Sequence, residues 1–416
     1  MQDDYTLGVL LSGRGFGKEL ALDTPIPTPT GWTTMGALQI GDQVLDEQGR
    51  VCSVLELFDD PSPKTCYELT FSDGSSIRAG ADHQWVTWTH RDRKRYLRRN
   101  DSPVDFPEDW VNFVQPPGVN RWGTAIAAAT KSGPQIRTTQ QVVDTFYQKT
   151  ARGDLNHCIP LARELQLPDA ELPIDPWLFG YWLGDGASAG ACLHVGTEDR
   201  DWVAERARAL GEPYWFSEDK TAWRIYLTDR KQRHPYDASR AGTLAARLRE
   251  LGVIHNKHVP NAYLRSSAEQ RAQLLAGLLD SDGTVHNGQI EFTSTREQLA
   301  RGVLELARSL SYAPVMSKGV AKLNGVEIGP KYRVMWRAHT NPFSMPRKRE
   351  RWRAPGAQGL RTRHRMIRSF EQIVSEPMRC ITVDSPNSMY LAGDAMIPTH
   401  NTRAGCEWIR AKAKLM

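Results

Sequence analysis

Two short sequences in the chain end in the same Asp-Gly pair and would place two carboxylates side by side. The first, LFGYWLGDG, carries Asp185, and the second, LAGLLDSDG, carries Asp282, 97 residues further on. The helix dipole disfavours a carboxylate at a helix C-terminus, and a second carboxylate beside it adds repulsion. A divalent cation held by both would offset this repulsion and activate water for attack on a phosphodiester. We therefore predict a metal site at Asp185 and Asp282, against the simpler alternative of two helix-ending turns.

Both sequences carry the signals of helices that pack closely. Asp175 before Pro176 is typical of an N-cap followed by proline in the first turn, and Ser266 with Glu269 predicts a capping box. Small residues lie four positions apart on one face of each helix, namely Gly180 and Gly184, then Gly277 and Ser281. Such residues let two helix backbones approach, which would bring the two aspartates together.

A phosphate-binding loop is interrupted near the start of the chain. The sequence SGRGFGK ends at Lys18, but Glu19 stands where a hydroxyl residue should follow. That hydroxyl appears at Thr402, directly after Asn401, and joining Lys18 to Thr402 gives the complete loop SGRGFGK-TRAGCEWIR. Residues 19–401 therefore read as an insertion, with junctions at Lys18–Glu19 and Asn401–Thr402.

Length and composition fit a globular protein of two or three domains, with 416 residues, 40% of them hydrophobic and 24% charged. The absence of any run of eighteen apolar residues argues against a membrane span. Six cysteines without a CxxC pair argue against a disulfide scaffold or a structural zinc site. We expect a cytoplasmic monomer, in a phage host cell.

Basic residues gather in one segment. From Lys331 to Phe370 there are twelve Lys or Arg against one acid, interleaved with aromatic residues, and Arg91–Arg99 forms a second cluster. Basic side chains release counterions from phosphates, and aromatic rings stack on bases. This pattern favours nucleic-acid binding over a solvated, arginine-rich linker.

The two motifs that end in Asp-Gly, LFGYWLGDG and LAGLLDSDG, resemble those of the two-motif LAGLIDADG homing endonucleases. KHVPNAYLRSS (257–267) and TSTREQLARGVLELARSLSY (293–312) support the resemblance. It implies two pseudo-symmetric αββαββα halves whose sheets lie over the DNA major groove. It also implies Mg²⁺-dependent cleavage of double-stranded DNA, with Lys220 and Lys318 in segments suited to assisting basic residues. Phe179, Tyr181 and Trp182 depart from the consensus, but Asp185 is retained.

The ends of the insertion resemble an intein, and the flanking loop is similar to that of phage terminase large subunits. ALDTPIPTPTGWTTMGALQIGDQVLDEQGR resembles the N-terminal splicing block, IRAGADHQWVTW the block with the assisting His83, and MRCITVDSPNSMYLAGDAMIPTHN the C-terminal blocks ending in His400-Asn401. Glu19 has no nucleophile, whereas Trp85, Cys380 and Thr402 match the class 3 inteins, which need none at that position.

This resemblance implies a route to splicing that needs no cofactor. Cys380 would attack the carbonyl of Lys18, and His83 would protonate the departing amine of Glu19. Thr402 would then take the acyl group from the thioester.

The C-terminal bond would break in a separate step. Asn401 would cyclise with help from His400, and an acyl shift would leave a Lys18–Thr402 peptide. Trp85 would pack beside the site and orient a reacting group through its indole N–H. Gly80 stands where many inteins have Thr.

The expected architecture is an all-β Hint horseshoe with an inserted α/β endonuclease. The expected limits are 1–18 for the N-terminal flank, 19–130 and 365–401 for the splicing domain, 131–364 for the endonuclease, and 402–416 for the C-terminal flank. Double-stranded DNA and the flanks in cis are the expected partners. Two alternatives stay open: a splicing-inactive or engineered-blocked precursor that keeps its DNA activity, and a terminase ATPase fragment with a permanent DNA-binding insert.

Overall fold

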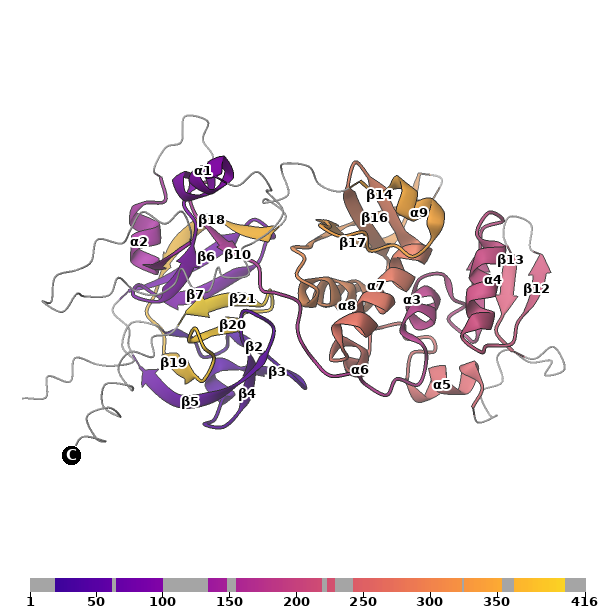
Figure 1. Cartoon of the computed structure of the whole chain (residues 1–416), viewed down its shortest axis with the longest axis horizontal. Coiled ribbons are helices and arrows are strands. Elements are labelled where there is room, and N and C mark those ends of the chain that lie inside the picture. The colour runs from indigo at the N-terminus through magenta and orange to yellow at the C-terminus, as the bar shows by residue number, and fades with distance from the viewer. Residues whose placement is uncertain are drawn as a thin grey trace, which may run out of the picture.

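The computed structural model describes residues 19–61, 65–99, 134–147, 155–218, 223–228, 242–323, 325–353 and 363–400. The predictions for Lys18, Lys220, Asn401 and Thr402 lie outside these residues. The described chain forms a β-rich unit and a unit in which helices pack on two smaller sheets (Figure 1). Within the described residues, no helix has the length and apolar character needed to cross a bilayer.

Strands from both ends of the insertion build the main sheet of the β-rich unit. In spatial order these antiparallel strands are β10 (Cys158–Pro160), β18 (His364–Ile373), β6 (Cys66–Phe71), β7 (Ser76–Gly80), β1 (Leu20–Ala21), β19 (Met378–Val383), β5 (Val51–Asp60) and β4 (Gln43–Leu45). β1 lies between β7 and β19, so the first residues of the insertion are held beside a strand from its last part.

A second sheet and several short elements complete this unit. The sheet runs β20 (Met389–Ala392), β21 (Ile397–His400), β8 (Gln84–Thr87) and β9 (Gln135–Thr138). The other elements are the hairpin β2 (Pro25–Thr28) and β3 (Gly31–Thr34), the 3₁₀ turn η1 (Met35–Ala37), and helices α1 (His90–Arg99) and α2 (Thr139–Asp144). Side chains from both sheets share one apolar core, which contains Ile77, Trp85, Ile381 and Tyr390.

Strand pairing shifts the limit between the two units. β9 pairs with β8, and β10 pairs with β18, although both strands lie in the range 131–364 that the sequence places in the endonuclease. These strands are three or four residues long and sit in a polar stretch, so they give little alternation to recognise. We place the start of the inserted unit after β10.

The inserted unit is arranged around helices α3 (Pro176–Asp185) and α7 (Ala268–Asp282), which lie at its centre (Figure 1). After α7 come β14 (Gly283–His286), β15 (Gln289–Ser294), α8 (Glu297–Ser309), β16 (Val315–Leu323), β17 (Val326–Arg337) and α9 (Pro346–Arg351), which is the expected αββαββα order. After α3 come β11 (Cys192–Val195), α4 (Arg200–Ala209), β12 (Trp215–Glu218), β13 (Trp223–Tyr226), α5 (Leu244–Glu250) and the short α6 (Asn261–Leu264).

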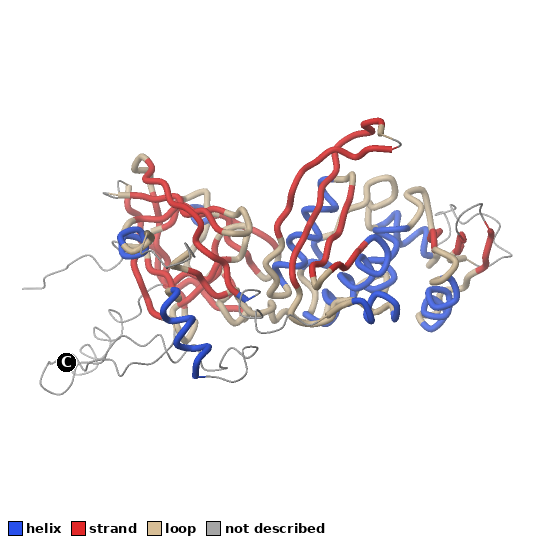
Figure 2. The backbone as a smooth tube through the Cα atoms, turned by 90° about the horizontal axis from the view of Figure 1, so that it is seen from above, coloured by secondary structure: helices blue, strands red, loops and turns tan. Residues whose placement is uncertain are grey.

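The first half departs from this order at one strand. The strand expected after α3 is reduced to a single bridge between Gly186 and Leu193, where the second half pairs Gly283 with Phe292 in a full strand. The predicted fold class, an all-β unit with an inserted α/β unit of two related halves, is confirmed. Seen from above, strands dominate one unit and most of the helices gather in the other (Figure 2).

Glycines let α3 and α7 touch through their backbones. A Cβ atom on Gly277 would lie 2.0 Å from the carbonyl oxygen of Trp177, and one on Gly180 would lie 2.2 Å from that of Leu274. Asp175 caps α3 as predicted, whereas the capping box of α7 uses Ser267 and Gln270, one residue later than the sequence suggested. The close contact of the two helices is confirmed.

Candidate functional sites

The first candidate site surrounds the N-terminal end of the insertion. In the β1–β19 pairing, Leu20 lies opposite Arg379 and Ala21 opposite Met378. Because the strands are antiparallel, the next step of this register places Glu19 opposite Cys380. On the other side of β1, the backbone N–H of Gly80 donates to the carbonyl oxygen of Glu19 at 3.0 Å. The residue that follows the junction is therefore held from both sides.

Tyr390 marks the place where three predicted parts of the site meet. Its side chain is buried, and burial followed by the nearby Cys380 thiol raises the pKa of its phenol, with a smaller contribution from Glu19. In the β20–β21 pairing Tyr390 lies opposite Thr399, the residue before His400. Sequence reasoning missed Tyr390, although its position inside the C-terminal block was a usable signal.

His83 and Trp85 are both fully buried and lie side by side. Their ring centroids are 4.4 Å apart, with an angle of 59° between the planes. The Trp85 indole N–H donates to Thr139 Oγ1 at 3.0 Å, and the Thr139 backbone N–H donates to the His83 carbonyl oxygen at 2.8 Å. The hydrogen bond predicted for Trp85 therefore goes to Thr139, which in turn fixes the backbone of His83. Thr139 was not predicted, because it lies in the range 131–364 that the sequence placed in the endonuclease.

His400 reaches the same strand as the other two side chains. It lies opposite Gln84 in the β21–β8 pairing, and its Nδ1 atom is 3.0 Å from Gln84 Oε1. Gln84 stands between His83 and Trp85 in β8. The predicted residues of this site therefore lie on segments of the two sheets of the β-rich unit. They are Glu19, Cys380, His83, Trp85 and His400.

Gly80 has little room for a larger residue. A Cβ atom at this position would lie 3.0 Å from Glu19 Oε2. The His83 backbone N–H donates to the Gly80 carbonyl oxygen at 3.1 Å, so the glycine also belongs to the turn that carries the histidine. At Gly80, where many inteins have Thr, the Glu19 side chain occupies the space that a larger side chain would need.

The second candidate site is formed by Asp185 and Asp282 at the ends of α3 and α7. The two carboxyl groups are close enough for each to shift the pKa of the other. Loss of hydration raises the pKa of Asp185. Loss of hydration and the neighbouring Asp185 charge raise the pKa of Asp282 to about 6, although Asp282 keeps access to solvent. The predicted meeting of the two aspartates is confirmed by this geometry.

Two buried lysines bind the helix ends that carry these aspartates. Lys257 Nζ donates to the carbonyl oxygens of Gly184 and Gly186 at 2.9 and 2.6 Å. Lys348 Nζ donates to four carbonyl oxygens, including those of Ser281 and Gly283 at 2.9 and 2.8 Å. The second pair of carbonyls lies 97 residues after the first, so the two lysines satisfy equivalent groups in the two halves.

The two lysines also respond to the carboxylates electrostatically. Burial lowers the pKa of each to about 8, while Asp185 acts in the opposite direction on both. Lys257 belongs to the sequence KHVP, which offered a signal, but the sequence analysis pointed to Lys220 and Lys318 instead. Lys318 lies 5.8 Å from the ring centroid of Tyr332, whose hydroxyl donates to Glu297 of α8, on the helix-covered side of its sheet.

Much of the basic segment has a structural role. Arg347 forms an ion pair with Asp199 of the first half, Lys348 caps α7, and the buried Arg365 pairs with Asp73 at 2.6 Å. Other basic residues alternate with the buried Val334 and Trp336 of β17 and so face away from the helices. These are Lys331, Arg333 and Arg337. The nucleic-acid prediction therefore applies to part of the segment.

The donor set at the helix ends fits a divalent cation. Two neighbouring carboxylates with raised pKa values supply hard oxygen ligands whose mutual repulsion a cation would relieve. Among the described residues, no cluster of three or more His, Cys, Asp or Glu side chains is arranged to hold a metal. A cation here would therefore draw further ligands from backbone carbonyls, water or the substrate.

Comparisons with known proteins concern one part of the α/β unit and the chain as a whole. A family model described as a LAGLIDADG-like domain matches residues 269–319. The chain is similar to the replicative DNA helicase DnaB of Mycobacterium intracellulare, with 34% identity over 406 residues, covering 97% of this chain and 62% of the helicase. It is also similar to DnaB of Mycobacterium leprae (strain TN), with 49% identity over 80 residues, covering 19% and 13%. The chain thus spans less than two thirds of the length of these curated relatives.

Two solved structures show weak likeness. A crystal structure of the MchDnaB-1 intein (N145AA) has 15% identity and a TM-score of 0.26, covering 92% of this chain and 99% of that chain. The crystal structure of I-DmoI in complex with DNA and Mn has 11% identity and a TM-score of 0.27, covering 39% and 89%.

The comparisons overturn one prediction. The flanking loop was expected to come from a phage terminase large subunit, but the curated relatives are replicative DNA helicases. A phosphate-binding loop of glycines and a lysine recurs in many nucleotide-binding proteins, so the loop alone does not distinguish hosts. The terminase and phage assignments are withdrawn.

Proposed function

We propose that the β-rich unit is a self-splicing intein domain and that the α/β unit is a homing endonuclease inserted into it. The observation that supports the proposal is the pairing of β1 with β19, because continuing its register by one residue brings Glu19 next to Cys380, beside Gly80 and the buried Tyr390. A thiol that must attack the carbonyl carbon just before Glu19 needs this proximity. The main sheet provides it by pairing the first strand of the insertion with one of its last.

The first step transfers an acyl group to sulfur. The Cys380 thiolate attacks the carbonyl carbon of Lys18, the bond to the Glu19 nitrogen breaks, and a thioester forms. His83 donates the proton that the departing amine requires, because an amide nitrogen leaves poorly unless it is protonated. The contacts of Trp85 and Thr139 hold His83 in place for this transfer.

The later steps restore a peptide bond. The Thr402 hydroxyl attacks the thioester, which frees the Cys380 thiol and leaves a branched ester. The Asn401 side-chain nitrogen attacks its own carbonyl carbon, forming a succinimide and releasing the Thr402 amine, with His400 moving the proton. That amine then takes the acyl group from its own oxygen, which yields the Lys18–Thr402 amide. The route is of the class 3 type, because Glu19 supplies no nucleophile.

The α/β unit cleaves double-stranded DNA with Asp185 and Asp282 as metal-binding residues. A bound divalent cation, Mg²⁺ or Mn²⁺, would lower the pKa of water and neutralise charge on the phosphodiester. Lys257 and Lys348 keep the helix ends and their carboxylates in position. The side of the sheets opposite the helices carries polar rows such as Thr293–Arg333 and Gln289–Arg337, which suit readout of base edges and phosphates in the major groove.

We propose a replicative helicase of the DnaB type as the host protein, supported by the curated relatives. The loop completed by joining Lys18 to Thr402 suits a nucleotide-binding host. The DNA target is then a site that spans the uninterrupted junction in the host gene.

Mass spectrometry of the purified 416-residue chain tests the splicing proposal. We expect the free segment 19–401 and a ligated peptide of 33 residues with a Lys18–Thr402 bond. A chain that remains intact for days, with Cys380 and Asn401 unmodified, would contradict the proposal and favour a splicing-inactive precursor. The endonuclease is tested separately, with a plasmid that carries the uninterrupted junction and added Mg²⁺.

A further inference from the structure

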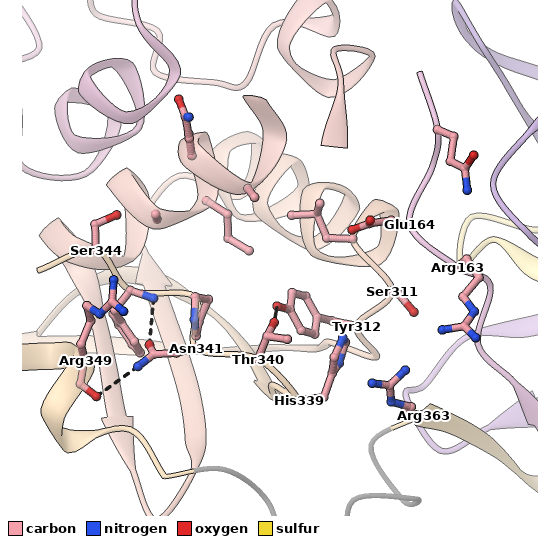
Figure 3. A pocket seen from close by; sticks show the side chains of 18 of the residues that line it. Arg163, Glu164, Ser311, Tyr312, His339, Thr340, Asn341, Ser344, Arg349 and Arg363 are labelled. Atoms are coloured by element: carbon pink, nitrogen blue, oxygen red, sulfur yellow. Dashed lines mark hydrogen bonds between the residues drawn. The ribbon is translucent and has the colours of Figure 1, made fainter. Parts of the chain in front are cut away.

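A cavity of about 870 Å³ lies between the two units and belongs to neither proposed active site. Its walls come from the turn before β5, the segment after β10, the first half of α7, the end of α8 and the segment between β17 and α9 (Figure 3). Four residues of α7 line the cavity, all at least six positions before Asp282: Ala272, Gln273, Leu275 and Ala276. The cavity is thus separate from the carboxylate pair.

The lining carries an excess of positive charge. Arg50, Arg163, Arg349 and Arg363 line the cavity, and Glu164 is the only carboxylate among the lining residues that the structure describes. Within the described chain, Arg50, Arg163 and Arg349 form no ion pair. Guanidinium groups gathered in a recess repel one another unless an anion joins them.

Two of these guanidinium groups lie close enough to His339 for their charges to affect its imidazole. Burial, then the charges of Arg363 and Arg163, lower the pKa of the His339 imidazole to about 4. The buried Nδ1 atom of His339 has no hydrogen-bond partner among the described residues. Figure 3 shows Arg163 and Arg363 extending toward His339 from the β-rich unit, while Arg349 lies at the other end of the cavity, near Asn341.

We propose that this inter-unit cavity binds a small, multiply charged phosphate anion, either inorganic polyphosphate or the phosphate chain of a nucleotide. Arginines are suited to paired hydrogen bonds with phosphate oxygens. The volume lies within the range of small-molecule sites. The proposal does not rest on splicing or on DNA cleavage.

The anion would also link the two units. Arg163 and Arg363 belong to segments next to strands of the β-rich unit, whereas His339 and Arg349 belong to the α/β unit. A ligand bound to both sets stabilises their contact by its binding free energy. Binding would also raise the pKa of His339, because the negative charge of the anion would offset the positive field of the two arginines.

Isothermal titration of the full chain with sodium tripolyphosphate at 0.15 M NaCl tests the proposal, with ATP titrated in parallel. A background with both Cys380→Ala and Asn401→Ala keeps the chain at constant length, because it blocks cleavage at both junctions. We expect saturable binding at one site, weakened about tenfold or more by Arg163→Gln, since each charged hydrogen bond contributes about 1.5–3 kcal/mol. Equal affinities for both ligands indicate a polyphosphate site, and tenfold tighter binding of ATP indicates a nucleotide site.

Control variants make the result specific. Arg301→Gln removes the same charge at an exposed position on α8, where Arg301 pairs with Glu297, and should change the affinity less than twofold. Arg349→Gln weakens binding from the opposite wall and serves if Arg163→Gln does not fold. The proposal is overturned if tripolyphosphate shows no saturable binding, if Arg301→Gln weakens it equally, or if only duplex DNA binding responds to Arg163→Gln.

Discussion

Leu20 lies opposite Arg379 across the antiparallel strands β1 and β19, and continuing this register by one residue brings Glu19 next to Cys380. Glu19 and Cys380 are separated by most of the insertion in sequence, yet their neighbours Leu20 and Arg379 are paired in the sheet. This relationship gives the thiol a short path to the N-terminal junction. It also explains why β1, a strand of only two residues, is placed between β7 and β19 and buried.

The hydrogen bond from Trp85 to Thr139 should matter for the rate of the first acyl transfer. Trp85→Phe keeps the ring beside His83 but removes the indole N–H. We expect N-terminal cleavage to slow about five- to tenfold, because a buried hydrogen bond contributes about 1 kcal/mol. The rate is measured by the appearance of the segment that begins at Glu19.

A double-mutant cycle isolates this contact. Thr139→Val removes the acceptor, and the double variant should be little slower than either single one. Fully additive losses would show that the two residues act independently. Trp88→Phe, a change in the same strand region but away from His83, provides the matched control.

Adding a methyl group at Gly277 should weaken the packing of α7 against α3. A Cβ atom there would lie 2.0 Å from the Trp177 carbonyl oxygen, so Gly277→Ala should lower the free energy of unfolding by about 1–3 kcal/mol or more. DNA cleavage would fall with it, because α3 and α7 carry the aspartates. Gly196→Ala meets no atom within 4 Å and should leave stability nearly unchanged in the same chemical denaturation assay.

DNA cleavage should depend on pH through Asp282. Its folded-state pKa is raised to about 6, so the carboxylate gains a proton as the pH falls through 6 and loses its capacity to bind a cation. We expect Mg²⁺-dependent cleavage to fall about tenfold for each pH unit below this value. A flat rate between pH 5 and pH 8 would contradict the role of Asp282.

The same raised pKa has a consequence for stability. An acid whose pKa is higher in the folded state favours folding in its protonated form, so its contribution grows as the pH falls from 6 toward the unfolded value near 4. Asp282→Asn should therefore raise the melting temperature at pH 8, and this gain should disappear near pH 4. A lower melting temperature at pH 8 would show that the carboxylate stabilises the fold.

The two activities should separate cleanly by mutation. Asp185→Asn should reduce cleavage of the junction plasmid at least a hundredfold and leave the splicing rate within twofold, since Asp185 lies in the α/β unit. Cys158→Ala, a buried cysteine in β10 that the mechanism does not use, should preserve both activities in a folded chain. Loss of splicing in Asp185→Asn would contradict the independence of the two units.

The sequence predicted a structural feature most reliably where a residue type has a single physical role, as glycine does at a close helix contact. Gly180, Gly184 and Gly277 indicated a close helix contact, and the structure shows it, because a Cβ atom at any of them meets atoms of the other helix. Cys380 lies in β19, the strand that pairs with β1, and the Asp-Gly motifs end α3 and α7. Such a prediction succeeds because the type of the residue alone limits what can pack against it, so the rest of the fold need not be known.

Features that depend on tertiary context could not be predicted in this way. β9 and β10 are strands because β8 and β18 offer partners, and their own sequences are too short to show alternation. Lys348 and Arg365 read as DNA-binding charges, but they bind carbonyl oxygens and Asp73 inside the protein. Local charge counts cannot distinguish a paired arginine or lysine from one that faces solvent.

Trapping the acyl group on sulfur tests the central claim most directly. In a Thr402→Ala chain the acyl group cannot move on, so the account predicts a thioester between Lys18 and Cys380. Hydroxylamine should release residues 1–18 as a hydroxamate, with a new N-terminus at Glu19, and Thr402→Ala combined with Cys380→Ala should release none. Equal release from both chains, or no release from either, would contradict the role of Cys380.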